Sequence, residues 1–154
     1  MRRLSVLLTL LLVLAPALAA QPAADSALVA GIYDDLARGD VEAVVAVLDV
    51  HVLWSEGAHS PQAGRHFGPG TVAAHVLHPQ ATAGITHVPD AITSDRAYLV
   101  AVGTTHRTEP AADRSLVTRF HHVWQVLDGR VVSVQRCDDT TGRSASARMT
   151  QASC

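Results

Sequence analysis

The sequence has no lysine, and its twelve basic residues are all arginines. Apart from Arg2 and Arg3 they form no cluster, and 14 acidic residues outnumber them. A domain that binds nucleic acid neutralises phosphates with a basic stripe. Because no such stripe is present, we expect no nucleic-acid partner.

An uninterrupted apolar run long enough for a membrane anchor is also lacking, since such a helix needs roughly 20 apolar residues. The N-terminal stretch instead combines Arg2 and Arg3, an apolar run over residues 4–14, Pro16 and the small residues 17–19. This order is typical of a secretory signal peptide. We therefore predict a signal over residues 1–19 that is cleaved near Ala19. The mature protein is expected to be exported, either to the periplasm or to the medium, without a membrane partner.

Cysteine is scarce, with only Cys137 and Cys154. Neither a closely spaced cysteine pair nor an HExxH motif is present, and zinc sites require three or four ligands at recognisable spacing. Nine histidines occur, and His75 and His78 lie three apart on a predicted helix, but no third ligand accompanies them. We expect no metal and no other cofactor. Two alternatives stay open for the cysteines: a disulfide, or a buried free Cys137, which residue habits favour.

The rest of the chain predicts one α+β domain over residues 26–141, between a short linker (20–25) and a flexible polar tail (142–154). Apolar spacing predicts a helix over residues 26–38, ended by Gly39, and a second helix that Asp40 caps. Alternation predicts strands near residues 50–55 and 65–67. A helix over residues 72–78, capped by Thr71, should stop at Pro79. Four strands follow at residues 85–93, 97–107, 115–127 and 130–139, so helices should pack on one face of a curved, mostly antiparallel sheet.

Asp128-Gly129 is the most informative pair, because Asp-Gly between two β-rich runs indicates a two-residue type I′ hairpin. If Leu127 faces Arg130, Trp124 should pair with Ser133 and His122 with Gln135. Opposed residues share a face of the sheet. The inward face should therefore carry these residues: Thr118, Phe120, His122, Trp124, Gln135, Cys137 and Asp139. Arg136 and Asp138 should lie on the solvated face.

Three stretches resemble the SnoaL-like branch of the NTF2-like superfamily, which is related to ketosteroid isomerases and polyketide cyclases. They read IYDDLARGDVEAVVAVLDVHVLW, PQAGRHFGPGTV and HHVWQVLDGRVVSVQRCDDT. The resemblance implies a cone-shaped domain around a cavity, and a homodimer through the outer sheet. Two positions depart from the ketosteroid isomerases. Trp54 stands where those enzymes keep a catalytic Asp, and Ile32 stands where they keep a Tyr, with Tyr33 one position away.

The inward face predicts a candidate catalytic pair, Asp139 and His122, because a carboxylate and an imidazole in an apolar wall suit proton abstraction beside a carbonyl. The resemblance also implies a pocket carboxylate near the end of the last strand, at Asp139 or Asp138. The alternative is that Asp139 ties down the strand end and His122 is a hydrogen-bonded core histidine. The expected substrate-binding residues are Trp54, Trp124, Phe120, Gln135, Tyr33 and Thr118.

Two functions are compatible with this pattern. One is an exported, cofactor-free isomerase, cyclase or hydrolase that acts on a small hydrophobic substrate by acid and base catalysis. The other is a non-catalytic module of the same fold that binds a small molecule or a partner. The first function needs Asp139 and His122 within hydrogen-bonding reach, whereas the second needs only the cavity.

Overall fold

The computed structural model describes residues 15–109 and 114–139. Most of the predicted signal peptide and all of the predicted tail, with Cys154, lie outside these residues. The helices are α1 (Ala15–Arg38), α2 (Val41–Ala46), α3 (Pro69–Val72), η1 (Ala73–Leu77) and α4 (His78–Thr82). The strands are β1 (Leu48–Glu56), β2 (Gly64–Phe67), β3 (Thr86–Asp95), β4 (Tyr98–Glu109), β5 (Arg114–Leu127) and β6 (Arg130–Asp139).

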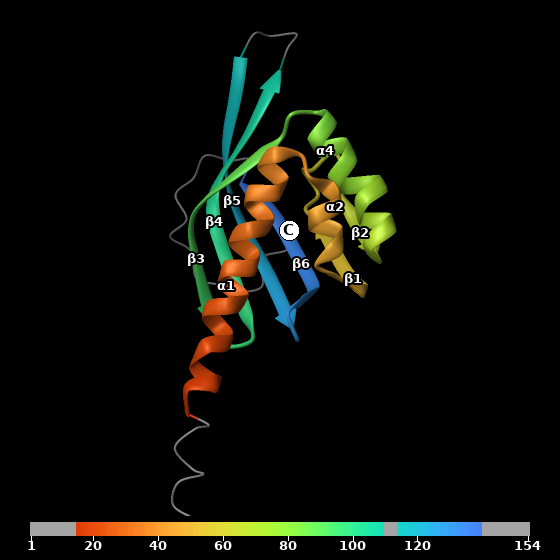
Figure 1. Cartoon of the computed structure of the whole chain (residues 1–154). Helices are drawn as coiled ribbons and strands as arrows, with labels where there is room; N and C mark the ends of the chain where they lie inside the picture. Colours follow the sequence, from red (N-terminus) through yellow and green to blue (C-terminus); the bar gives the residue numbers. More distant parts are fainter. Residues whose placement is uncertain (1–14, 110–113, 140–154) are drawn as a thin grey trace, which may run out of the picture.

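The six strands form one sheet in the order β2-β1-β6-β5-β4-β3, and the helices cover one of its faces (Figure 1). Only the pairing of β1 with β6 is parallel among the described strands. The expected α+β architecture and all of the expected strands are confirmed. No helix in the described part of the chain is long and apolar enough to cross a membrane.

The boundary between α1 and α2 is as predicted. Gly39 has a φ of 71°, the left-handed conformation that commonly ends a helix. The side chain of Asp40 accepts a hydrogen bond of 3.1 Å from the backbone N–H of Ala43 and so caps α2. The expected start of the first helix at residue 26 is wrong, because the alanine-rich stretch before it continues α1 back to Ala15.

Pro79 does not end the third helical segment, which is another correction. The chain stays helical from Pro69 to Thr82 and passes through the π-helical turn η1 just before Pro79. A proline lacks the backbone N–H that a continuing helix uses and clashes with the carbonyl one turn earlier. The wider π turn changes that hydrogen-bonding pattern, so the helix continues across the proline.

The β5–β6 hairpin has the predicted turn, since Asp128 and Gly129 both have positive φ angles, of 50° and 72°. The predicted register holds only next to this turn. The pairing shifts after Val126↔Val131, and Gln125 then pairs with Ser133. Val132 is the extra residue of a β-bulge.

The bulge reverses which residues of β6 face inward. Trp124 pairs with Val134 rather than with Ser133, and His122 pairs with Arg136 rather than with Gln135. The expected inward position of Gln135 is therefore wrong: Gln135 is exposed and Arg136 is buried. Cys137 is buried but disulfide-bonded, so the expectation of a free thiol is also wrong.

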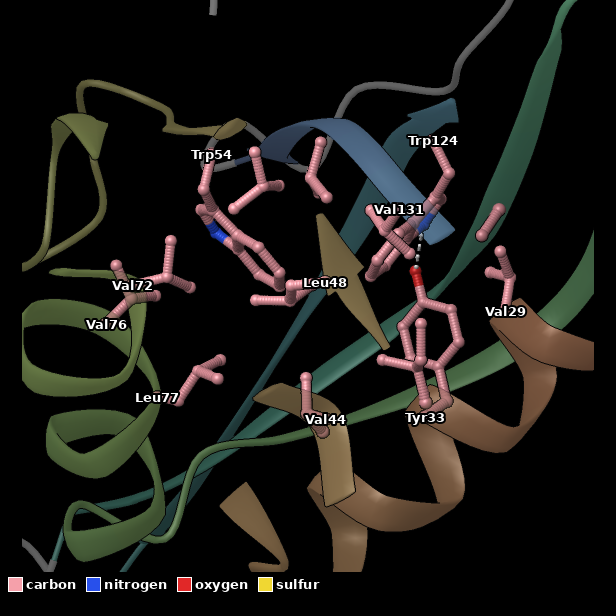
Figure 2. Close-up of a cluster of buried hydrophobic side chains, with 14 of the residues drawn as sticks. Val29, Tyr33, Val44, Leu48, Trp54, Val72, Val76, Leu77, Trp124 and Val131 are labelled. Carbon is pink, nitrogen blue, oxygen red and sulfur yellow. Dashed lines mark hydrogen bonds between the residues drawn. The ribbon is translucent and has the colours of Figure 1, made fainter. Parts of the chain in front are cut away.

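A hydrophobic core fills the space between the helices and the sheet (Figure 2). Trp54 and Trp124 are fully buried, with ring centroids 5.7 Å apart and planes nearly perpendicular. This edge-to-face contact is one of the arrangements that aromatic rings prefer. Tyr33 from α1 makes a second edge-to-face contact with Trp124, and its side chain is buried.

Candidate functional site

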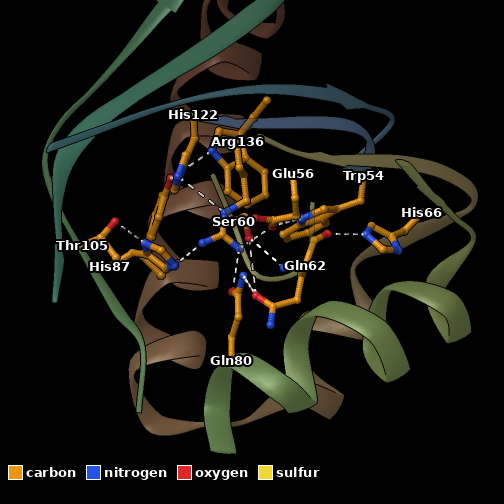
Figure 3. A network of polar contacts seen from close by, with 12 residues as sticks. Trp54, Glu56, Ser60, Gln62, His66, Gln80, His87, Thr105, His122 and Arg136 are labelled. Carbon is orange, nitrogen blue, oxygen red and sulfur yellow. Dashed lines mark hydrogen bonds and ion pairs between the residues drawn. The ribbon is translucent and has the colours of Figure 1, made fainter. Parts of the chain in front are cut away.

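A buried arginine organises the polar interior of the domain. Arg136 lies on β6 with only 3% of its surface exposed, and its guanidinium reaches residues from four other elements (Figure 3). Nη1 donates to Oε1 of Gln80 at 2.9 Å, Nη2 contacts Nε2 of His87, and Nε lies 3.5 Å from Nε2 of His122. A guanidinium can only donate, so these three partners act as acceptors.

Glu56 is the counter-ion of this arginine. Its Oε1 lies 3.1 Å from Nη1 of Arg136 and accepts a hydrogen bond of 2.8 Å from Nε1 of Trp54. The Trp54 ring also stacks under the guanidinium, with Cζ of Arg136 5.6 Å from a ring centroid. The pair places one positive and one negative charge in the interior, and a buried charge of this kind is costly unless it is paired.

His87 connects the arginine to β4. Because Nε2 of His87 accepts from Arg136, Nδ1 carries the proton and donates to Oγ1 of Thr105 at 3.0 Å. Burial, and then the positive charge of Arg136, lower the pKa of His87 well below the ordinary 6.5. His87 is therefore a neutral ring with both nitrogens engaged.

His122 on β5 is the second histidine that contacts the arginine. Its Nε2 faces Arg136, so its Nδ1 donates to the hydroxyl of Tyr33 at 2.8 Å. Burial, and then the positive charge of Arg136, lower the pKa of His122 well below 6.5. Nε1 of Trp124 also donates to Tyr33, at 3.1 Å, and burial raises the pKa of that phenol. All buried side-chain nitrogens and oxygens in the described part have partners.

A cavity of about 190 Å³ opens beside this network. His87 and Gln80 form part of its wall, and both contact Arg136 on their other side. The remaining lining residues are His59, Ser60, Pro61, Gln62, Ile85, Thr105, Arg107, Leu116 and Thr118. The loop between β1 and β2 therefore forms one side of the cavity, and the strands β4 and β5 form another.

Strand alternation explains the order of residues from the core to the cavity. On β4 the inward positions run from Leu99 through Ala101 and Gly103 to Thr105 and Arg107, and their exposure increases at the end. On β5 the matching partners are Trp124, His122, Phe120, Thr118 and Leu116. The interior thus changes from apolar, through the arginine network, to a mixed polar and apolar cavity.

The profile of the SnoaL-like domain matches residues 29–134 of the chain. The chain belongs to the SnoaL-like domain family. No curated protein sequence matches this SnoaL-like chain significantly. Among solved structures, an NTF2-like protein of unknown function from Burkholderia pseudomallei is 28% identical with a TM-score of 0.67, and the match covers 75% of this chain and 91% of that one.

Two further structures share the fold. A putative polyketide cyclase from Xanthomonas campestris is 19% identical with a TM-score of 0.64, covering 75% of this chain and 90% of the cyclase. An LEH-like epoxide hydrolase from M. tuberculosis is 18% identical with a TM-score of 0.65, covering 77% of this chain and 85% of the hydrolase. The NTF2-like architecture expected from the sequence is confirmed.

The predicted site residues of this SnoaL-like domain separate into groups. Thr118 lines the cavity, and His122 lies in the arginine network. The four predicted aromatic residues are buried in the core and do not line this cavity: Tyr33, Trp54, Phe120 and Trp124. Gln135 is on the outer face.

The predicted catalytic carboxylate is affected by the register shift. The backbone of Asp139 pairs with Arg119 rather than with Thr118, and the backbone of Asp138 pairs with Phe120. Position 138 thus takes the place opposite Phe120 that was expected of Cys137. The side chains of both aspartates lie outside the described part of the chain, so the role of Asp139 stays a prediction.

The sequence analysis missed Arg136 and three of its polar contacts, Glu56, Gln80 and His87, and it also missed the cavity residues Thr105 and Arg107. One signal for Arg136 was available. The predicted register turned Val134 toward solvent and Ser133 inward, which is the opposite of what their polarity favours. A bulge that restores Val134 to the core also brings Arg136 inward.

The histidine-rich appearance of the sequence does not correspond to a metal site in the described residues, which contain no group of three potential ligands. His75 and His78 are exposed on the helical segment. His75 stacks on His66 with ring centroids 6.2 Å apart, and Nε2 of His66 contacts the backbone oxygen of Gln62.

Proposed function

We propose that this SnoaL-like domain binds a small organic molecule in the cavity between the β1–β2 loop and strands β4 and β5. The observation that carries the proposal is that the cavity wall contains His87 and Gln80, which are buried and held in place by Arg136. Buried polar groups that converge on a pocket are typical of ligand sites, because they fix the orientation of what binds.

The size of the cavity limits the ligand. Drug-sized ligands occupy pockets of about 300 to 1,000 Å³, whereas this one has about 190 Å³. An apolar cavity of about 150 Å³ accommodates benzene. The ligand is therefore a compact molecule of about one ring, with apolar contacts to Ile85 and Leu116 and hydrogen bonds to the polar part of the wall.

The arrangement favours binding over acid and base catalysis. His87 and His122 have both ring nitrogens engaged, and burial together with the charge of Arg136 keeps both rings neutral. Glu56 is paired with Arg136 and Trp54 and does not line the cavity. A general base must reach the proton that it removes, and none of these three groups is free to do so.

Fragment binding followed by NMR tests this proposal. We expect compounds of about one ring to shift the backbone amide resonances of Thr105 and Thr118. The cavity-filling variant Thr118→Phe should abolish these shifts, whereas Val117→Phe, which changes the neighbouring exposed residue, should preserve them. A fragment library without any binder at the cavity would exclude the proposal.

A cofactor-free isomerase, cyclase or hydrolase is the second candidate. It is supported by the named activities of the two fold neighbours, the putative polyketide cyclase and the epoxide hydrolase. It requires Asp139, with His122 as its partner, to act on the substrate. Turnover of carbonyl and epoxide libraries, abolished by Asp139→Asn in a folded protein, would favour this candidate.

Export and dimerisation complete the proposal. If residues 1–19 are a signal, mass spectrometry of the exported fraction should find a chain that begins at or near Ala20. A homodimer should appear at twice the mass of the mature chain in light scattering. An uncleaved product that stays inside the cell would exclude export.

A further inference from the structure

We propose that the cavity selects a compact monocarboxylate, with Arg107 as the residue that pairs with the carboxylate group. This inference rests on the proposed binding function and names its ligand class. Within the described residues, the lining of the cavity includes one guanidinium and no Asp or Glu. The formal charge of this lining is therefore positive.

Arg107 has the position that such a role requires. It is half-buried at the open end of β4, two residues after Thr105, and it pairs with Leu116 of β5. Two residues along a strand share a face, so Arg107 points to the same side of the sheet as Thr105. A ligand in the cavity thus contacts the apolar side chain of Leu116 and the guanidinium of Arg107 together.

The charge of Arg107 is not neutralised by another described residue. The exposed Arg119 and Arg38 have carboxylate partners, Asp90 and Asp35 respectively, whereas the described part of the chain provides no ion pair for Arg107. A planar guanidinium can donate two parallel hydrogen bonds to a carboxylate, which gives both affinity and orientation. A carboxylate ligand would supply the missing partner.

The contact with Arg136 also orients the amide group of Gln80, so that the cavity wall can donate a hydrogen bond to a ligand. Oε1 of Gln80 accepts from Arg136, and this bond turns the amide group so that its Nε2 lies 3.5 Å from Oε1 of Gln62. The NH₂ group has two hydrogens, so one remains for a ligand. Thr118 adds a hydroxyl group to the lining, whereas the hydroxyl of Ser60 donates to Oε1 of Gln62 at 3.5 Å. This set of donors suits a carboxylate better than a cationic ligand.

Benzoate and benzamide form a matched pair of probes, because they have nearly the same shape and differ in charge. We expect calorimetry to show that the protein binds benzoate at least about tenfold more tightly than benzamide. Arg107→Gln should remove most of this preference, and Arg107→Lys, which keeps the charge without the planar fork, should retain part of it. Arg65→Gln, at an exposed arginine outside the cavity, should leave the preference unchanged.

The outcomes separate this inference from the binding function. Equal affinities for the two probes, or a preference that survives in folded Arg107→Gln, would overturn the role of Arg107. If neither probe binds while other fragments shift the resonances of Thr105 and Thr118, the carboxylate inference is wrong and the binding function stands. If no fragment binds at all, both proposals fail.

Discussion

Arg136 and His122 lie directly opposite each other on β6 and β5, with Nε of the arginine 3.5 Å from Nε2 of the histidine. This pairing exists because a single bulge at Val132 shifts the hairpin by one residue. It fixes the tautomer of His122 and places a permanent positive charge beside the wall of the cavity. The stability of the domain and the properties of its cavity therefore depend on the same cation.

Removing that cation should destabilise the fold. Arg136→Met leaves Glu56 buried without its counter-ion, so the free energy of unfolding should fall by about 3 to 5 kcal/mol. Arg119→Gln removes an exposed ion pair with Asp90 and should cost no more than about 1 kcal/mol. Urea denaturation measures both.

The double variant Arg136→Met with Glu56→Gln checks the cause of that loss. It removes both charges while leaving an acceptor for Nε1 of Trp54, so part of the stability should return. A single variant no more costly than Arg119→Gln, or a double variant that costs the sum of the singles, would contradict the buried ion pair.

Stability should fall on acidification below about pH 6.5. The pKa values of His87 and His122 are lowered in the folded state, so below pH 6.5 the unfolded chain binds more protons at these rings than the folded protein does. Acid therefore stabilises the unfolded chain relative to the folded one. Above pH 6.5 neither ring lowers the free energy of unfolding. Below it, each ring lowers the free energy of unfolding by roughly 1 kcal/mol per pH unit until the pH reaches the folded-state pKa.

Two variants isolate these histidines in the pH dependence. His122→Gln should make the slope of the free energy of unfolding between pH 6.5 and 5 clearly smaller. His75→Gln, at an exposed ring, should leave the slope unchanged. The same slope in all three proteins would show that the buried rings do not control it.

The two faces of β5 should differ strongly in their response to truncation. Trp124→Ala removes a fully buried aromatic residue and should cost about 3 to 5 kcal/mol. Gln125→Ala, on the other face, should stay within about 0.5 kcal/mol. Equal losses in denaturant unfolding would be inconsistent with the observed orientation of the strand.

The faces of β5 follow directly from the sequence pattern, whereas on β6 only the polarity of Ser133 and Val134 argues against the register that the turn predicts. Alternation from Phe120 through His122 to Trp124 is regular and the Asp128-Gly129 turn anchors it, so these residues are buried as expected. The bulge on β6 depends on packing between the strands and the helices. No residue between Arg130 and Val134 signals it by its own conformational preference.

The site itself was only partly accessible to sequence reasoning for the same reason. His87, Glu56 and Gln80 come from three separate elements, and nothing in their local sequence relates them. They meet because each contacts the guanidinium of Arg136, which the predicted register placed in solvent. An error of one residue in one strand was enough to hide the centre of the network.

Gly103 is a further point at which the packing can be tested. A Cβ atom added there would lie 2.1 Å from the backbone oxygen of Val88 and 2.8 Å from Cε1 of Phe120. Gly103→Ala should therefore destabilise the protein by about 1 to 3 kcal/mol. Gly31→Ala, in the open on α1, should raise stability by up to about 1 kcal/mol. Thermal unfolding measures both variants. If Gly103→Ala were more stable than Gly31→Ala, the close packing described around Gly103 would be wrong.

The most direct test of the central claim, that a ligand binds against a wall held by Arg136, is a long-range ¹H–¹⁵N NMR spectrum of the histidine rings. It is recorded without ligand and then with the tightest-binding fragment. We predict neutral rings protonated at Nδ1 for both His87 and His122, with a shift of the His87 signals on binding and no comparable shift at exposed His51. Protonation of His87 at Nε2, or His87 signals that do not change when the fragment is bound, would contradict the account.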